Sequence, residues 1–419
     1  MNVFDNNLQE VRIMNFKLIA IIVFSLTYVY KLALSLISLR SEKNPIPENV
    51  SDVYDTETYE KWRAYHSEKI RFDIVSEAFS FVIMLALLIS NAFAWFATLF
   101  PDNLFMQTFS VVLLLSITSL ASIPFAWHDT MKIEQKYGFN KSSAKTFWVD
   151  QLKSFIIELV IMTGIGSLLF GLHVWLGDWL ILAFAVAMTV IILFVAFLYP
   201  FLSKIFNKFT PLEDGELREK LTALLEKNGY RVRAINVMDA SRRTTKSNAY
   251  FSGFGKMKTI VLYDNLLDQL STDEICAVFA HELGHGLHKD TLKNQILSFF
   301  QMAVISVLAW LTLRTTQIFT DFGFESINYG MAIILIMSVE FAFISPLFSL
   351  LVNFLARRAE YAADGHAAKE GYTEALISGL KILARENYAD LAPSPLIVKL
   401  EYSHPTLSQR ITALSRNKK

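Results

Sequence analysis

Seven long apolar stretches constrain the fold of this chain more than any other feature. A helix needs about 20 apolar residues to cross the ~30 Å hydrocarbon core of a bilayer. Stretches of that kind occur at residues 18–38, 74–100, 105–126, 155–176, 179–202, 295–313 and 331–355. Because a soluble fold of 419 residues cannot bury seven such helices, we predict a mainly α-helical, polytopic membrane protein surrounded by membrane lipids.

The composition agrees with this class of protein. Hydrophobic residues make up 53% of the chain and charged residues 19%, and the formal net charge is zero. A zero net charge gives no electrostatic support to a nucleic-acid partner. The single cysteine, Cys276, excludes an intrachain disulfide, and its apolar neighbours favour a small buried thiol.

The basic residues of the connections predict the orientation in the membrane. With seven spans, the first, third and fifth connections lie on the same side as the C-terminal tail. Residues 38–72 and 128–153 carry eleven Lys and Arg, whereas the connections after spans two, four and six carry only Arg314. The positive-inside bias therefore places the odd connections and the tail in the cytoplasm and the N-terminus outside.

We divide the chain into four parts on this basis. Residues 1–202 hold spans one to five with two basic cytoplasmic loops, and residues 293–355 hold spans six and seven. Residues 203–292 form a soluble segment with a predicted helix ending at Asn228 and Gly229 and a small β-sheet after it. Residues 356–419 form a helical C-terminal segment on the same side, so a single site can draw on both polar segments.

The soluble segment contains the sequence HELGH, which has the pattern of a helical zinc-hydrolase site. Ser271 and Glu274 form a capping box that predicts the start of its helix. On a helix, His281 and His285 lie on one face and can hold one metal ion. A catalytic zinc takes three protein ligands and one water, and Glu282 is placed to accept that water's proton as general base.

The third ligand has to come from elsewhere, and Glu360 in RRAEYAAD is the leading candidate. Glu360 and Asp364 are an i, i+4 pair on a predicted helix on the same side of the membrane. Asp364 would then orient a histidine ligand through its other ring nitrogen. The competing interpretation is an ordinary charged helix face, and the rival ligands are His288, His366 and His404.

Several longer blocks carry a resemblance to a known family. They are YEKWRAYHSEKIRF, QKYGFNKSSAKTFWVDQLK, NAYFSGFGKMKTIVLYDNLL, HELGHGLHKD, RRAEYAADGHA and YSHPTLSQRI. In this order they resemble the type-1 CAAX prenyl proteases, which are seven-span zinc metalloendopeptidases. The resemblance covers nearly the whole chain, and several blocks are far more specific than the HELGH motif.

The resemblance implies seven transmembrane helices around a large water-filled chamber, closed by a zincin-like cytoplasmic segment. It implies one zinc ion (Zn²⁺) per chain, held by His281, His285 and Glu360, with Glu282 as base and Asp364 as the matching acidic residue. It further implies that the segment of Asn248, Ala249 and Tyr250 pairs with an extended peptide or lipidated-peptide substrate by β-augmentation.

His404 and Arg410 match the family's SHP…R tail. There, a cationic or donor side chain could stabilise the oxyanion, although Arg410 fits equally well as a structural partner for a carboxylate. Compared with eukaryotic members the chain is short and ends in SRNKK without a retrieval signal. These features suggest a bacterial cytoplasmic membrane rather than the endoplasmic reticulum.

The differences from eukaryotic members also leave alternatives to CAAX processing. A bacterial relative could be a broad quality-control protease that cleaves membrane-associated peptides without prenyl groups. A transporter or receptor with a metal site is disfavoured, because it needs no general base beside the metal. A site-2-type protease is disfavoured because the HELGH helix is expected to continue into the polar stretch KDTLKNQ before span six.

The acidic residue Glu340 lies in the middle of the seventh span. An ionisable side chain at that depth is costly unless it faces protein or water. We therefore expect Glu340 to face the chamber or to pair with a basic residue.

Overall fold

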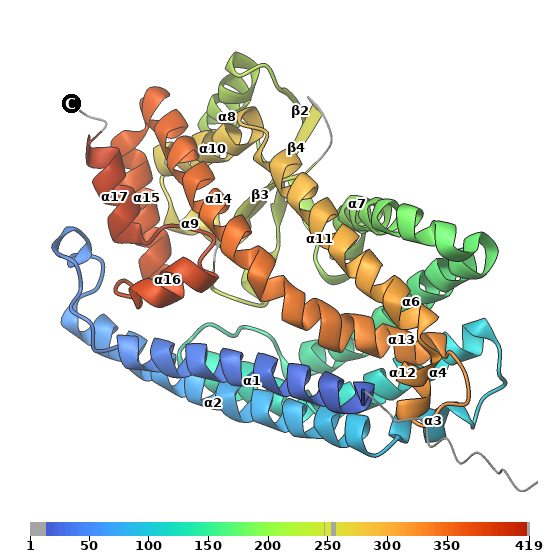
Figure 1. The fold of residues 1–419 in the computed structure, drawn as a ribbon. Coiled ribbons are helices and arrows are strands. Elements are labelled where there is room, and N and C mark those ends of the chain that lie inside the picture. The colour runs from blue at the N-terminus through green and yellow to red at the C-terminus, as the bar shows by residue number, and fades with distance from the viewer. Residues whose placement is uncertain (1–13, 247, 253–256, 417–419) are drawn as a thin grey trace, which may run out of the picture.

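The computed structural model describes residues 14–246, 248–252 and 257–416, and it is mainly helical. In Figure 1, the long helices α1 (Phe16–Ser41) and α2 (Thr56–Ile89) lie side by side. Helices α6 (Ala144–Leu176) and α7 (Leu180–Phe206) lie together at the right of the view. Helices α11 (Asp290–Arg314) and α14 (Ala342–Lys369) run between these pairs toward the sheet.

Helices occupy all seven stretches expected to span the membrane. In the described part of the chain, five of them are long and apolar enough to cross a bilayer. A sixth span results if Leu104–Leu120 and Ile123–Glu134, bent by 43°, count as one. The remaining expected span forms α7. Its described apolar part is Ala185–Phe194, because other side chains of this helix lie outside the described residues. The polytopic helical class is confirmed.

Shorter helical elements lie within the spans and in the connections between them. They are the 3₁₀ turns Glu48–Val50 and Gly177–Trp179, α3 (Ala92–Ala97), α4 (Leu104–Leu120), α5 (Ile123–His128), the π-helical turns Asp129–Glu134 and Leu335–Phe341, α12 (Thr316–Asp321) and α13 (Tyr329–Ile334).

Several membrane helices extend beyond the predicted spans, α2 and α14 by the most residues. Helix α2 begins at Thr56, so residues assigned to the first connection form its projecting first turns. Helix α14 continues to Lys369 without a break at residues 355–356, where we divided span seven from the tail. The segment that carries Glu360 is thus a rigid continuation of a membrane helix.

The soluble segment contains a four-stranded sheet in the order β1-β2-β4-β3. Its strands are β1 (Phe209–Pro211), β2 (Arg231–Met238), β3 (Ala249–Ser252) and β4 (Met257–Tyr263). Only β2 and β4 are parallel, and β3 lies at an edge, antiparallel to β4. The small sheet predicted after residue 229 is present as β2, β3 and β4, whereas the short β1 lies before α8 and was not predicted.

Helices α8 (Glu216–Lys227), α9 (Asp264–Gln269), α10 (Thr272–Leu287) and α15 (Thr373–Glu386) accompany this sheet. Helix α8 ends at the predicted residues, with Asn228 as its cap and Gly229 at φ +79°. One buried apolar cluster joins α8, the sheet, α10 and α15, and it includes the fully buried Cys276. This core fixes α10 against the sheet.

The structure brings the odd connections and the tail together, as expected for segments on one side of a membrane. Tyr54 in the first connection donates to the backbone oxygens of Ala384 and Ala389. In the third connection, Glu134 pairs with Lys246 of the fifth at 3.4 Å. Helices α16 (Pro395–Glu401) and α17 (Leu407–Arg416) complete the tail, which these contacts hold over the soluble segment.

Glu340 is half-buried, and among the described residues no basic side chain pairs with it. Its Oε1 accepts a hydrogen bond from the hydroxyl of Thr312 on α11, and its Oε2 is buried and accepts none. Of the two expected alternatives, pairing with a basic residue is wrong, because the described partner is the hydroxyl of Thr312, and facing the chamber stays a prediction. The contact joins α11 to the π-helical turn that precedes α14.

Helices α10 and α14 approach each other through a glycine. A Cβ added at Gly284 would lie 2.8 Å from the Cα of Ala363 and 3.1 Å from the Cβ of His366. The backbone of α14 cannot yield to such a contact without moving. Gly284 therefore sets the distance between the histidine helix and the helix of Glu360.

We predict that Gly284→Ala destabilises the protein by about 1–3 kcal/mol, because overpacking forces two rigid helices apart. The measurement is the thermal unfolding midpoint of the full chain in detergent. Gly365→Ala is the matched control, since a Cβ there meets nothing within 4 Å. An unchanged midpoint for Gly284→Ala would contradict the close-packing argument.

Candidate active site

Helix α10 positions both histidines of the HELGH motif. The predicted capping box is present, with the Ser271 side chain bonded to the Glu274 backbone and the Glu274 side chain bonded back. The helix ends at Leu287, and Lys289 then adopts a left-handed conformation at φ 56°. The expected continuation of this helix into KDTLKNQ is wrong, because the turn at Lys289 makes that stretch the start of α11.

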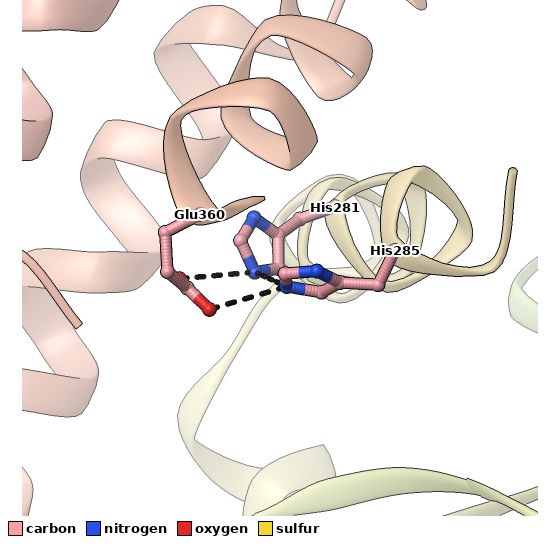
Figure 2. Close-up of side chains that lie close together, drawn as sticks. All are labelled: His281, His285 and Glu360. Atoms are coloured by element: carbon pink, nitrogen blue, oxygen red, sulfur yellow. Dashed lines mark hydrogen bonds and ion pairs between the residues drawn. The ribbon is translucent and has the colours of Figure 1, made fainter. Parts of the chain in front are cut away.

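Figure 2 shows His281, His285 and Glu360 converging from α10 and α14. The two Nε2 atoms lie 3.2 Å apart. Glu360 Oε2 is 3.5 Å from His281 Nε2, and Glu360 Oε1 is 3.2 Å from His285 Nε2. In the described part of the chain, this is the group of three side chains whose ligand atoms all lie close enough to share one ion.

The donor set and its spacing fit a zinc ion. Ligand atoms at about 2.0–2.1 Å from a tetrahedral zinc lie about 3.3 Å apart, which the three measured separations match. Two imidazoles and one carboxylate are the donors of many catalytic zinc sites, and such a set leaves a fourth position open. Glu360 is buried, and its Oε2 accepts no hydrogen bond, as expected for an atom reserved for a metal.

Asp364 orients His281. Its Oδ1 lies 2.9 Å from His281 Nδ1, so Nδ1 carries the proton and Nε2 keeps its lone pair for a metal. Arg410 donates two hydrogen bonds to the Asp364 carboxylate, from Nε to Oδ2 at 2.9 Å and from Nη2 to Oδ1 at 2.6 Å. Its remaining nitrogen lies 3.4 Å from Glu360 Oε2. This geometry favours a positioning role for Arg410.

Asp290 orients the other histidine, and sequence reasoning missed it. Its Oδ2 lies 3.1 Å from His285 Nδ1, and Lys293 donates to its Oδ1 at 2.9 Å. Asp290 is buried at the start of α11, where an acidic side chain is also favoured by the helix dipole. The available signal was an acidic residue immediately after the motif, in HELGHGLHKD.

Glu282 and His404 are two further polar side chains beside the three candidate ligands. Glu282 is half-buried and follows His281 directly on α10. His404 is exposed, with its Nε2 at 3.2 Å from Glu360 Oε1 and its Nδ1 beside the Ser403 hydroxyl. Both side chains are therefore accessible to a substrate bound at the cluster.

The other predicted residues lie outside the cluster. His288 caps the end of α10 and is exposed, and His366 lies 4.0 Å from Glu370, so neither rival ligand joins the three. Asn248 precedes the edge strand β3, which contains Ala249 and Tyr250. The side chain of Tyr250 lies outside the described residues.

The carboxylates around His285 change its protonation. Burial alone would lower its pKa, but the hydrogen bonds to Glu360 and Asp290 outweigh that effect and raise the pKa to about 9. Without a metal, His285 is therefore protonated at neutral pH. A metal ion has to displace that proton to bind.

Comparisons with known proteins agree with the fold and the site. The model of the CAAX prenyl protease N-terminal domain, described as five membrane helices, matches residues 35–208, and that of peptidase family M48 matches residues 211–418. The chain is thus a membrane-embedded metallopeptidase. It belongs to the CAAX prenyl protease 1 family, as the resemblance in its sequence blocks predicted.

Relatives align over nearly the whole chain. The CAAX prenyl protease 1 homolog of Arabidopsis thaliana is 32% identical, covering 92% of this chain and 94% of the relative. The Homo sapiens homolog is 28% identical, covering 95% of each. The crystal structure of S. mikatae Ste24p superposes with a TM-score of 0.90 at 28% identity, covering 96% of this chain and 99% of that one.

We predict that Asp290→Asn weakens metal binding about 10- to 100-fold, because it replaces the charged acceptor of His285 Nδ1 with a neutral amide and so weakens the hydrogen bond that fixes this ring. Competition with a chromophoric chelator on the full chain measures this affinity. Lys293→Gln is the matched control, since it removes the other partner of Asp290 and leaves the His285 contact in place. Equal metal affinity of Asp290→Asn and the parent would contradict the role of Asp290.

We also predict that metal affinity falls by about tenfold per pH unit as the pH drops below the raised pKa of His285. Affinity falls toward acidic pH because the raised pKa of His285 keeps a competing proton on this ring below about pH 9. Calorimetry in buffers of different ionisation enthalpy should detect proton release of about one per metal at pH 7. No release at pH 7 would contradict the assignment of His285 as a protonated ligand.

Proposed function

We propose that the chain is a zinc-dependent endopeptidase with His281, His285 and Glu360 as ligands and Glu282 as general base. The observation that carries the proposal is the convergence of these three donors at 3.2–3.5 Å, with a carboxylate behind each histidine. Such outer carboxylates, hydrogen-bonded to the other ring nitrogen of a histidine ligand, are typical of metal sites.

Glu282 and two residues of the tail, His404 and Arg410, have the proposed roles in catalysis. Zinc, when bound, acts as a Lewis acid and lowers the pKa of a water to about 7. Glu282 takes the proton from the attacking water and passes it to the leaving amine. His404 is exposed beside Glu360, so it is placed to donate to the developing oxyanion. Arg410, buried against Asp364, acts mainly by holding Asp364 and thereby His281.

The edge strand β3 is the proposed platform for the peptide. The backbone oxygen of Asn248 accepts from Tyr263 on β4, so in an antiparallel ladder Asn248 and Tyr250 face β4. Ala249 and Phe251 then point their backbone groups to the free edge. A substrate strand would pair with these two residues, and the Asn248 side chain, which accepts from Ala249 N–H at 2.8 Å, would have to release it.

The substrates we propose are extended peptides, with lipidated C-terminal segments as the leading class. The names of the relatives support prenylated CAAX-type peptides, and the membrane-embedded fold supports lipidated chains in general. The second candidate is cleavage of membrane-associated peptides without prenyl groups. Both functions use the same metal site and the same edge strand.

We further propose that the site faces the cytoplasm and opens to a water-filled chamber between the spans. The basic first and third connections, which contact the soluble segment and the tail, support this orientation. Only 6% of the apolar window is buried in each of α1 and α2. Helices that line a hollow expose both an inner and an outer face, whereas a solid bundle would bury one of them.

Glu282→Gln is predicted to abolish peptide cleavage while leaving metal binding unchanged, because the amide cannot accept the water's proton. A fluorogenic peptide assay and metal analysis of the same sample measure the two properties. Glu274→Gln on the same helix is the control, since Glu274 belongs to the cap. Full activity of Glu282→Gln, or full activity after zinc chelation, would overturn the proposed function.

Matched prenylated and unprenylated peptides distinguish the two substrate classes. We expect mass spectrometry to show cleavage near the prenylated cysteine at a rate at least several-fold above that of the unprenylated peptide. Equal rates for the two peptides would favour the broader quality-control function.

A further inference from the structure

A basic cavity lies where α6 begins and α7 ends, away from the metal cluster. Its volume is about 490 Å³, which is in the range of small-molecule sites. Six cationic side chains line this cavity, which we name the α6–α7 cavity; they are Lys145, Lys153, Lys204, Lys208, Arg242 and Arg243. They come from three separate segments of the chain.

The cavity has a large excess of positive charge. Asp150 is the acidic side chain in its lining, and it pairs with Arg243 at 3.2 Å and with Lys153 at 3.8 Å. The other four cations, from Lys145, Lys204, Lys208 and Arg242, are exposed. One carboxylate cannot neutralise six cations, so the cavity is suited to an anion with several oxygens.

The cavity lies at the edge of the membrane region. The apolar stretches of α6 and α7 were predicted at residues 155–176 and 179–202, and the cavity residues Ser143–Lys153 and Lys204–Lys208 lie just outside them. Trp148 is exposed beside the cavity, and tryptophan is enriched at the membrane interface. The headgroups of a bilayer would therefore lie at the level of the cavity.

An apolar strip leads from the cavity into the membrane region. Val149 lines the cavity wall, and Leu152 and Ile156 follow on the same face of α6 at helical spacing. All three are exposed, as side chains in contact with lipid would be. A free phosphate ion would make no contact with this apolar strip, whereas the acyl chains of a lipid would pack against it.

We propose that the α6–α7 cavity binds the phosphate headgroup of an anionic phospholipid, with the acyl chains along Val149, Leu152 and Ile156. Basic pockets between membrane helices on the cytoplasmic side are known to suit such headgroups. The ligand would also cover Arg242 and Arg243, which lie in the segment between β2 and β3. The bound lipid therefore ties that segment to the ends of α6 and α7.

The test uses the full chain in detergent micelles that contain phosphatidylcholine, with phosphatidylglycerol added in increasing amounts. We expect phosphatidylglycerol to raise the thermal unfolding midpoint and to appear as a retained adduct in native mass spectrometry. In the variant Lys145→Gln, Lys204→Gln, Lys208→Gln, Arg242→Gln, the apparent affinity should fall on the order of a thousandfold. The unfolding midpoint of this variant without phosphatidylglycerol shows whether the variant is folded.

The control variant carries Arg40→Gln, Lys43→Gln, Arg71→Gln and Lys132→Gln, which removes the same charge from exposed residues outside the cavity. It should bind phosphatidylglycerol as the parent does. Equal loss in both variants would overturn the proposal in favour of bulk surface charge. Equal stabilisation by glycerol phosphate without acyl chains would overturn the lipid assignment and leave a site for free phosphate.

Discussion

The buried carboxylates of α14 and their partners are the interaction on which the rest of the structure depends. Glu360 is 5% exposed and Asp364 2% exposed, and carboxylates at that depth are costly unless they are paired. Their partners come from two other parts of the chain, with His281 and His285 on α10 and with His404 and Arg410 in the tail. Three segments that are distant in the sequence must therefore meet at one point.

That requirement explains how the membrane part and the soluble part are joined. The two histidines belong to the soluble segment, but every carboxylate that holds them comes from a helix that continues from a membrane span. Asp290 begins α11, and Glu360 and Asp364 lie on the extension of α14. The metal cluster is thus assembled between the soluble core and the ends of two rigid helices. The membrane helices therefore position the carboxylates of the site as well as holding the protein in the membrane.

The sequence predicted the parts of this site that follow from helical spacing. His281 and His285 share a face at i, i+4, and so do Glu360 and Asp364, and span parity placed both pairs on one side. Asp290 could not be predicted in this way, because its approach to His285 depends on the left-handed turn at Lys289. A non-glycine residue in that conformation leaves no mark in a hydrophobic pattern, which also explains why we predicted too long a histidine helix.

Other differences have equally local causes. The length of α14 was underestimated because hydropathy marks where the lipid ends, whereas the backbone hydrogen bonds of a helix continue into water. The π-helical turn at Leu335–Phe341 and the contact of Glu340 with Thr312 depend on the packing of α11, which a single span cannot reveal. The short β1 forms only because β2 offers an antiparallel partner.

The packing of α7 connects the two sites that the structure defines. Helix α7 packs against α11, and the chain direction places the C-terminal end of α7 on the same side as Asp290 at the start of α11. That end of α7 contributes Lys204 to the basic cavity. Packed helices are close to incompressible, so α7 and α11 hold each other in place. The cavity and the carboxylate that orients His285 therefore lie on two helices that pack against each other.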